Sequence, residues 1–284
     1  MISVFALGKH KSAKYREKTV MVKSYNKSVP IPKLKGEDPF PEISAFSVLV
    51  TDVESRFVLY EKNSSIRLLP ASTTKIVTAL VALDYYSLDS ILTVPELNVE
   101  GQKMNLIPGE QISVRNLIYG LLVYSANDAA EVLASSYPGG KQSFVKAMNL
   151  KVEEMGLENT FFENPSGFDG EMQYTTAFDL TKITDYAMKN NFFRDVVGTK
   201  EIIVGSYNAE IAHRLKNINK LIGEVEGVLG VKTGWTENAK ENLVTFLDRN
   251  GRKIIVVVLN SQDRFGDTKK IIDWVFKNYS WDED

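Results

Sequence analysis

The sequence predicts an α+β fold in which an antiparallel sheet is flanked by helices and carries an inserted helical lobe. β-Rich segments occur near both ends of the globular part, a block of helical patterns separates them, and an amphipathic helical pattern closes the chain. Because the helical block interrupts the strands and does not alternate with them, strands from both ends are expected to share one sheet. A cleft between sheet and lobe is the expected place for a functional site.

Composition narrows the classes of function. The chain has 284 residues, of which 44% are hydrophobic and 25% charged, as in a globular protein with a substantial core. The net charge of −2 gives no general attraction to nucleic acid, and the absence of cysteine excludes disulfides, thiolate metal sites and a cysteine nucleophile. Histidine occurs only at His10 and His213, without an HExxH motif, so we expect neither a metal nor a cofactor.

Residues 1–40 form the first expected unit, a basic, Pro-containing N-terminal arm and linker. Residues 1–36 hold nine Lys/Arg and one Glu, a net charge of +8. The arm is either a solvated tail or a segment attracted to anionic lipid or wall polymer. Its opening, MISVFALGKHKSAKYREK, has a short apolar piece before the basic residues, the reverse of a secretory signal, so we expect no export signal there.

Residues 41–284 form the second expected unit. We expect a sheet subdomain at about 41–70 and 198–284 and a helical lobe at about 71–197. Segments 47–52 and 56–61 predict a hairpin, and the following TTKIVTALVALDYY is apolar on nearly every side, which indicates a buried helix. Further patterns predict helices at 113–124, 127–136, 141–155, 176–190 and 267–279, and strands at 199–206, 227–234, 241–248 and 252–260.

Ser72 and Lys75 lie three residues apart where this buried helix begins. Two other SxxK pairs occur, and about one is expected by chance. Ser24–Lys27 lies in the polar arm, and Ser143–Lys146 lies in an amphipathic helix where the lysine points to water. Burial should lower the pKa of Lys75 toward a value useful for a base beside a serine nucleophile. The alternative is a helix-capping serine with a lysine that reaches to solvent.

Two further motifs carry candidate chemistry. Ser125–Asn127 lies in a turn between two apolar helical runs, where its side chains can face a cleft or cap a helix together with Asp128. The similar Ser206–Asn208 is typical of a hairpin turn. Lys232–Gly234, the one KTG, ends a β-rich run and has a chance expectation of about a tenth. Its glycine permits close approach of another backbone, its Lys and Thr can bind a carboxylate, and its strand edge can serve an oxyanion hole; the alternative is a strand end with a turn.

The order SxxK, SxN, KTG is that of penicillin-binding proteins and serine β-lactamases. Residues 41–284 resemble the D-alanyl-D-alanine carboxypeptidases, serine peptidases among the low-molecular-mass penicillin-binding proteins. The resemblance rests on LLPASTTKIVTALVALD, YSANDAAEVLA, ENPSGFDGEMQYTTAFDLTKI, HRLKNINKLI, GVLGVKTGWT and DTKKIIDWVF. It implies a β-lactamase/transpeptidase-like fold and an extracytoplasmic enzyme of the bacterial envelope. Such an enzyme removes the terminal D-Ala of peptidoglycan stem pentapeptides and is inhibited by β-lactams.

The resemblance also implies catalytic roles. Ser72 would be the acylated nucleophile and Lys75 its general base. Ser125 and Asn127 would relay protons and hold the substrate amide, and Lys232 would assist electrostatically.

Substrate binding is implied for a second set of residues. Thr233, Thr236 and Arg264 would contact the substrate carboxylate. Gly234 completes the motif, and the oxyanion hole would use the backbone N–H groups of the nucleophile and of Trp235.

Departures from the family pattern leave more than one function open. Family members usually have Gly where this chain has Lys240, and many continue beyond the last helix with a β-rich domain and an anchor, so we expect any membrane attachment to be N-terminal. A serine β-lactamase would need a deacylating residue, for which Glu163 is the one stand-in. A D,D-endopeptidase and a catalytically silent wall-binding homologue also fit the motifs. Asp169 and Asp179 are interpreted as turn and helix-cap residues.

Overall fold

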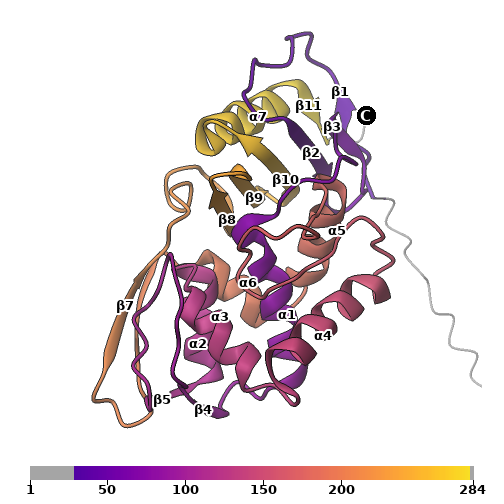
Figure 1. The fold of residues 1–284 in the computed structure, drawn as a ribbon. Helices are drawn as coiled ribbons and strands as arrows, with labels where there is room; N and C mark the ends of the chain where they lie inside the picture. Colours follow the sequence, from indigo (N-terminus) through magenta and orange to yellow (C-terminus); the bar gives the residue numbers. More distant parts are fainter. Residues whose placement is uncertain (1–28, 282–284) are drawn as a thin grey trace, which may run out of the picture.

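A five-stranded antiparallel sheet forms the centre of the computed structural model, which describes residues 29–281 (Figure 1). Strands from the beginning of the globular part lie beside strands from its end, as the sequence predicts, and the α+β class is confirmed. In spatial order the strands are β3 (Val58–Lys62), β2 (Ser47–Asp52), β10 (Arg252–Ser261), β9 (Lys240–Arg249) and β8 (Val228–Thr236).

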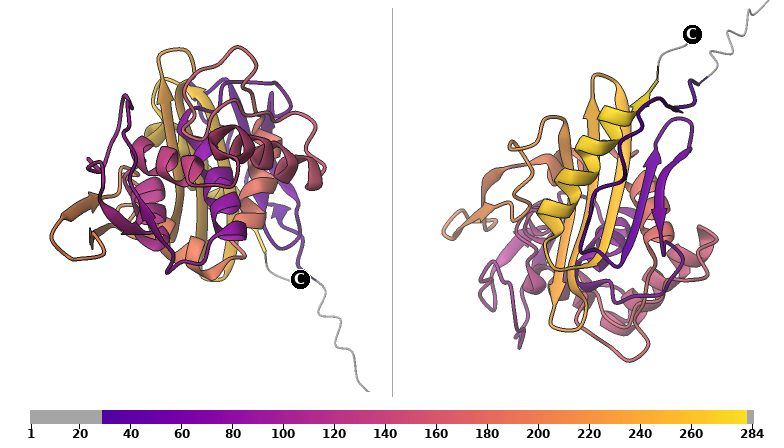
Figure 2. Two further views of the ribbon diagram at one scale, coloured as in Figure 1. Left: turned by 60° about the horizontal axis from the view of Figure 1, so that its bottom comes forward. Right: turned by 90° about the horizontal axis from the view of Figure 1, so that it is seen from above.

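Strand β10 is buried on both faces, which explains its continuous run of β-branched residues. Its side chains alternate between two cores, with Ile255 and Val257 facing the helical lobe and Ile254 and Val256 facing the opposite side. Helix α7 (Arg264–Asn278) covers this second face, and α5 (Ala177–Ala187) packs on the first (Figure 2). The sheet is therefore held between two layers of helices.

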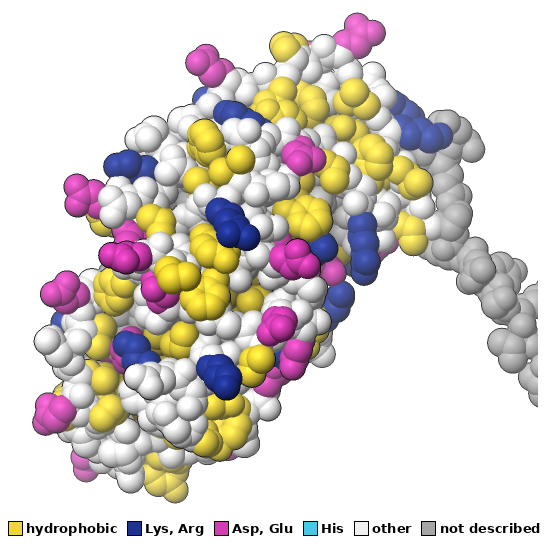
Figure 3. Space-filling model, turned by 45° about the vertical axis from the view of Figure 1, so that its right-hand side comes forward, with side chains coloured by type: hydrophobic (Ala, Val, Ile, Leu, Met, Phe, Trp, Pro, Cys, Tyr) yellow, Lys and Arg dark blue, Asp and Glu magenta, His cyan; other side chains and the backbone are white. Residues whose placement is uncertain are grey.

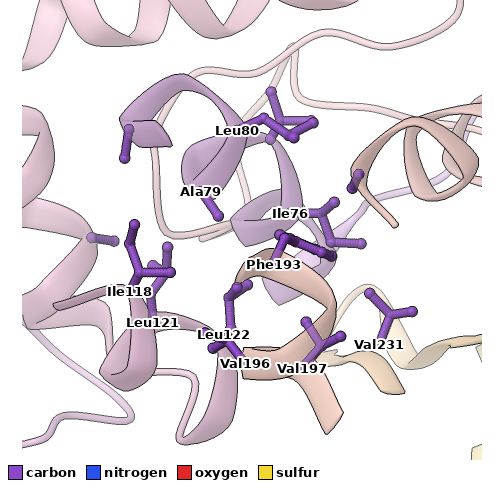
Figure 4. Packing of buried hydrophobic residues seen from close by; sticks show 14 of the residues in the cluster. Ile76, Ala79, Leu80, Ile118, Leu121, Leu122, Phe193, Val196, Val197 and Val231 are labelled. Atoms are coloured by element: carbon purple, nitrogen blue, oxygen red, sulfur yellow. The ribbon is translucent and has the colours of Figure 1, made fainter. Parts of the chain in front are cut away.

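Helix α1 (Lys75–Tyr85) runs through the middle of the helical lobe and is buried from its first residue through Ala82. Figure 4 shows part of this core, in which Ile76 of α1 and Phe193 are both buried. The predicted all-round burial of this helix is confirmed. The helices around it are α2 (Val114–Val123), α3 (Asn127–Ser135), α4 (Gly140–Glu154) and α6 (Asn191–Gly198), the last of which the sequence did not predict.

Residues 201–216 do not join the central sheet. Strands β6 (Glu201–Gly205) and β7 (Ala212–Lys216) form a separate hairpin beside α2, and Val204 is the buried residue of β6. The five-stranded sheet resumes at β8, so the boundary expected at residue 198 differs from the structure. A second pair that the sequence did not predict is β4 (Ile91–Thr93) with β5 (Gln111–Ser113).

The described part of the N-terminal linker packs on the sheet subdomain. Strand β1 (Lys33–Leu34) pairs with β11 (Tyr279–Ser280). The ring of Phe40 stacks on the ring of Tyr60, with 3.3 Å between the two ring centroids. Residues 1–28 of the expected basic arm lie outside the described residues. Between residues 29 and 281, no helix is both long and apolar enough to cross a membrane.

Candidate active site

Ser72 lies in a single 3₁₀ turn, Ala71–Thr74, directly before α1. Pro70 begins the turn and accepts the backbone N–H of Thr73. Because a 3₁₀ helix has three residues per turn, side chains at i and i+3 are aligned. Lys75 therefore lies over Ser72, and its Nζ donates a hydrogen bond of 3.0 Å to Ser72 Oγ.

Lys75 is fully buried, and its Nζ also donates to the backbone carbonyl of Ser166. Burial lowers its pKa from 10.5 to about 7, with the carboxylates of Glu131 and Asp128 opposing the shift. Near neutral pH a large fraction of Lys75 is unprotonated and can accept a proton from Ser72. A solvent-exposed lysine could not do so at this pH.

Ser125 and Asn127 lie at the break between α2 and α3, as expected. Ser125 has a left-handed backbone, with φ of 62°, and accepts a hydrogen bond of 2.8 Å from the Nζ of Lys232. Asn127 is anchored through its Nδ2 to the carbonyl of Glu100 at 2.9 Å. Lys232 is itself buried, which lowers its pKa well below the ordinary value, and the charges of Lys75 and Arg264 add to this effect.

The KTG motif lies on β8, the edge strand that faces the helical lobe. A Cβ placed on Gly234 would stand 3.0 Å from the backbone N of Ser72, so glycine is what allows this close approach. The outer edge of β8 pairs with no other strand in the described part of the chain, which leaves backbone groups there open to a ligand. Trp235, the second expected oxyanion donor, is 62% exposed at this edge.

The residues expected to bind a carboxylate lie at one end of the same site. Thr233 is buried, and its Oγ1 lacks a hydrogen-bond partner within residues 29–281. Thr236 donates to Asp169 at 2.7 Å, and Arg264 Nη1 donates to the carbonyl of Gly234 at 2.8 Å. Burial lowers the pKa of Arg264, and Glu241 opposes the shift, yet a guanidinium remains protonated at neutral pH.

A cleft of about 790 Å³ joins these groups. Of the ten expected site residues, eight line it, while the two lysines lie beneath its floor. The lining comprises Ser72, Glu100, Gly101, Gln102, Ser125, Asn127, Ser166, Gly167, Phe168, Asp169, Ile218, Thr233, Gly234, Trp235, Thr236, Glu237 and Arg264.

The sequence look-alikes lie elsewhere. Ser143–Lys146 lies on α4 with its lysine exposed, and Ser206 bonds to Asn208 within the β6–β7 turn. A second cavity, of about 390 Å³ between β2, β3 and α5, contains no expected catalytic residue.

Figure 3 shows the side of the molecule turned to the right in Figure 1, where basic and acidic side chains are interspersed among apolar ones.

Three residues in or behind the cleft were missed by sequence reasoning. Asp169 was interpreted as a turn residue, but its carboxylate reaches across to Thr236 and to Asn238. Ser166 and Glu131 lie behind Lys75. The one sequence signal for Asp169 and Ser166 is their place in the segment ENPSGFDGEMQYTT, and nothing in the pattern of α3 distinguished Glu131 from a solvated residue.

The structure accounts for one departure from the family pattern and for the stand-in residue of the β-lactamase alternative. Lys240 takes a left-handed backbone, with φ of 57°, at the position where the family usually has Gly, so the turn is kept at some conformational cost. Glu163, the stand-in for a deacylating residue, accepts the backbone N–H of Met172 within its own loop and does not line the cleft.

Comparison with known proteins agrees with this geometry. A family described as D-alanyl-D-alanine carboxypeptidase matches residues 34–263. The chain is 33% identical to D-alanyl-D-alanine carboxypeptidase DacF of Bacillus subtilis over 245 residues, covering 83% of this chain and 63% of that relative. It is 34% identical to D-alanyl-D-alanine carboxypeptidase of Streptomyces sp. (strain K15), over 83% of this chain and 88% of that relative. The crystal structure of the Streptomyces K15 DD-transpeptidase matches with a TM-score of 0.79 at 34% identity, over 84% of this chain and all of that one.

Proposed function

Because the chain belongs to the D-alanyl-D-alanine carboxypeptidase family, we propose that it is a serine-type enzyme that removes the terminal D-Ala from peptidoglycan stem pentapeptides. The observation that carries the proposal is the pair of Ser72 and Lys75, in which a fully buried lysine with a pKa of about 7 bonds to a serine at 3.0 Å. The chain spans under two thirds of the length of the Bacillus relative, so this activity is assigned from the site.

Acylation begins at Ser72. Its Oγ attacks the carbonyl carbon of the penultimate D-Ala while Lys75 takes the hydroxyl proton. The N–H groups of Ser72 and Trp235 stabilise the oxyanion. The C–N bond then breaks, and the proton held by Lys75 reaches the leaving amine of D-Ala through Ser125, which is bonded to Lys232, so that Lys75 is neutral again.

Deacylation returns the enzyme to its starting state. Water attacks the ester carbonyl and gives its proton to Lys75, and Ser72 recovers its proton as the acyl group leaves. Every step uses groups that the chain itself supplies, so the mechanism needs no metal or cofactor. A β-lactam presents a strained amide to the same serine and would form a long-lived acyl-enzyme.

Recognition of the peptide end falls to the carboxylate-binding residues. Arg264 supplies the positive charge, and Thr233 and Thr236 supply hydroxyl donors. The unpartnered Oγ1 of Thr233 supports this assignment, because a bound carboxylate would satisfy it. Asn127 would hold the substrate amide on the other side of the nucleophile.

Stem peptides of the wall lie outside the cytoplasm, so we place the protein in the bacterial cell envelope. The basic arm of residues 1–36 would favour anionic lipid or wall polymer there. A shift of the protein onto anionic vesicles that is lost at high salt, compared with a chain lacking the arm, tests this part of the proposal.

Labelled penicillin tests the reaction. The protein, Ser72→Ala and the matched control Ser143→Ala are incubated with the drug, and intact mass is followed over time. We expect a stable one-to-one adduct on the parent and on S143A and none on S72A, followed by D-Ala release from a pentapeptide. An unmodified parent with intact drug would contradict the nucleophile assignment and favour a silent binder. Drug consumed without a lasting adduct would identify a β-lactamase, and cleavage of cross-linked peptide a D,D-endopeptidase.

A further inference from the structure

Glu131 lies in α3, one helical turn beyond Asn127, and does not line the cleft. Its side chain is only 12% exposed, an uncommon location for a carboxylate without a function or a partner. Its Oε2 pairs with Lys141 Nζ of α4 at 2.8 Å, and Oε1 lies 3.0 Å from the same nitrogen. Oε1 also accepts the hydroxyl of Ser166, at 3.4 Å.

Ser166 connects this carboxylate to the catalytic lysine. Its backbone carbonyl accepts a hydrogen bond from Lys75, and its hydroxyl points to Glu131. One buried residue thus separates the general base from a negative charge that the substrate does not touch. Glu131 is absent from the cleft lining, so it does not touch the substrate directly, and its connection to the reacting atoms runs through Ser166 to Lys75.

We propose that Glu131 is a positioning residue for acylation, whose negative charge behind Lys75 sets the pH above which Ser72 reacts. The inference rests on the proposed serine mechanism. Burial alone would hold Lys75 neutral to low pH, and the Glu131 carboxylate opposes that effect more than any other charge does. The lysine therefore changes protonation near neutrality, where it can both accept and return a proton.

Other charges around Lys75 do not duplicate this role. Asp128 also favours the ammonium form, but its carboxylate is held by the backbone N–H groups of Met104, Leu106 and Ala129 and fixes that loop. Lys232 of β8 acts in the opposite direction, because two buried ammonium groups repel each other. Arg264 interacts with Lys232, and Lys141 partly neutralises Glu131.

The electrostatic account predicts opposite pH shifts for two partners in one ion pair. Glu131→Gln removes the negative charge, so the rising limb of acylation rate against pH should move down by about one pH unit. Relative to its own plateau, E131Q would then be about fivefold faster than the parent at pH 6. Lys141→Met leaves the Glu131 charge unneutralised, so the rising limb of the acylation rate should move to higher pH.

Timed quench with labelled penicillin between pH 5 and 9, read by intact mass, measures these limbs. Glu131→Asp keeps the charge and should restore the parental limb, and Glu154→Gln, an exposed carboxylate on α4, should leave the limb in place. Unshifted limbs with a uniformly lower plateau, or shifts of one sign in both E131Q and K141M, would overturn the inference. If E131Q does not fold, the inference is tested by K141M alone, in which the rising limb should still move to higher pH. A parent that is never acylated would instead overturn the proposed function.

Discussion

Thr236 and Asp169 are joined across the mouth of the cleft by a hydrogen bond of 2.7 Å, which the threonine hydroxyl donates to the carboxylate. The other oxygen of Asp169 accepts from Asn238 Nδ2 at 3.0 Å. On the proposed role of Thr236, a substrate carboxylate would have to take this hydroxyl from a carboxylate already in place. We therefore expect Asp169 to compete with the peptide end for Thr236.

Asp169→Asn should lower KM for a D-Ala-D-Ala peptide by about fivefold with little change in kcat, because it removes a like charge worth about 1 kcal/mol. Steady-state release of D-Ala measures both constants. Asn238→Ala is the matched control, since it removes the second contact and keeps the charge. An unchanged or higher KM in D169N would show that Asp169 supports the cleft without competing.

Gly234→Ala should slow acylation by about 10- to 100-fold, because the new Cβ would stand 3.0 Å from Ser72 N and 3.1 Å from Ala71 Cβ and so push β8 away from the nucleophile. Rates of adduct formation with labelled penicillin give the effect. Gly205→Ala is a suitable control, since its Cβ would meet only Ile211 O at an ordinary 3.5 Å. Parental acylation in G234A would mean that the close approach is not required.

Lys75→Met should be more stable than the parent at pH 7. In the parent, folding buries the Lys75 amine, which is charged and hydrated in the unfolded chain, and this burial costs free energy that methionine avoids. The pKa of Lys75 is depressed to about 7 in the folded protein, so the unfolded state binds more protons from there up to about pH 10. The parent therefore gains stability with rising pH in this window, and the gap to K75M should narrow by about 2–4 kcal/mol between pH 7 and 10. Urea unfolding at several pH values measures the gap, and a constant gap would contradict the burial argument.

His213→Ala should destabilise the protein by about 1–3 kcal/mol, since it leaves Oε1 of the buried Glu110 without its hydrogen-bond partner His213. His213 Nε2 lies 2.8 Å from Glu110 Oε1, and its Nδ1 lies 2.9 Å from Met104 O, so both ring nitrogens face acceptors. Denaturant midpoints give the loss, and Arg214→Ala on the adjacent exposed position should change little. The double variant H213A/E110A should lose much less than the sum of the two singles; strict additivity would argue against a coupled pair.

The fold and the main site could be predicted because both depend on local patterns. An apolar helix directly after Ser72 indicated that Lys75 enters the core, and the amphipathic pattern around Ser143 indicated the opposite for Lys146. These two predictions needed only the neighbours of each residue along the chain. The grouping of Ser125 and Lys232 with Ser72 in one site followed from the motif order of the resemblance, whereas the hydrogen bond between Ser125 and Lys232 was not predicted.

The remaining features depend on contacts between segments far apart in the sequence. Asp169 reaches Thr236 across 67 positions, and Ser166 meets Lys75 across 91. The periodicity of the sequence does not predict such contacts, because the loop that makes them is irregular and is held by its own side chains. For example, Asn164 accepts hydrogen bonds from the backbone N–H groups of Gly167 and Phe168. The β6 segment has strand composition, but only its packing on α2 shows that it belongs to the lobe.

Pairing of β1 with β11 brings the two ends of the described chain together beside β3, where Tyr279 also bonds to Leu59. This is the edge of the sheet opposite to β8. Tension applied between the ends would first load this short pair and next the contacts of β2 with β10. Strand β8, which carries the KTG motif, lies outside this path, so tension between the two ends would not be transmitted directly to the geometry around Ser72.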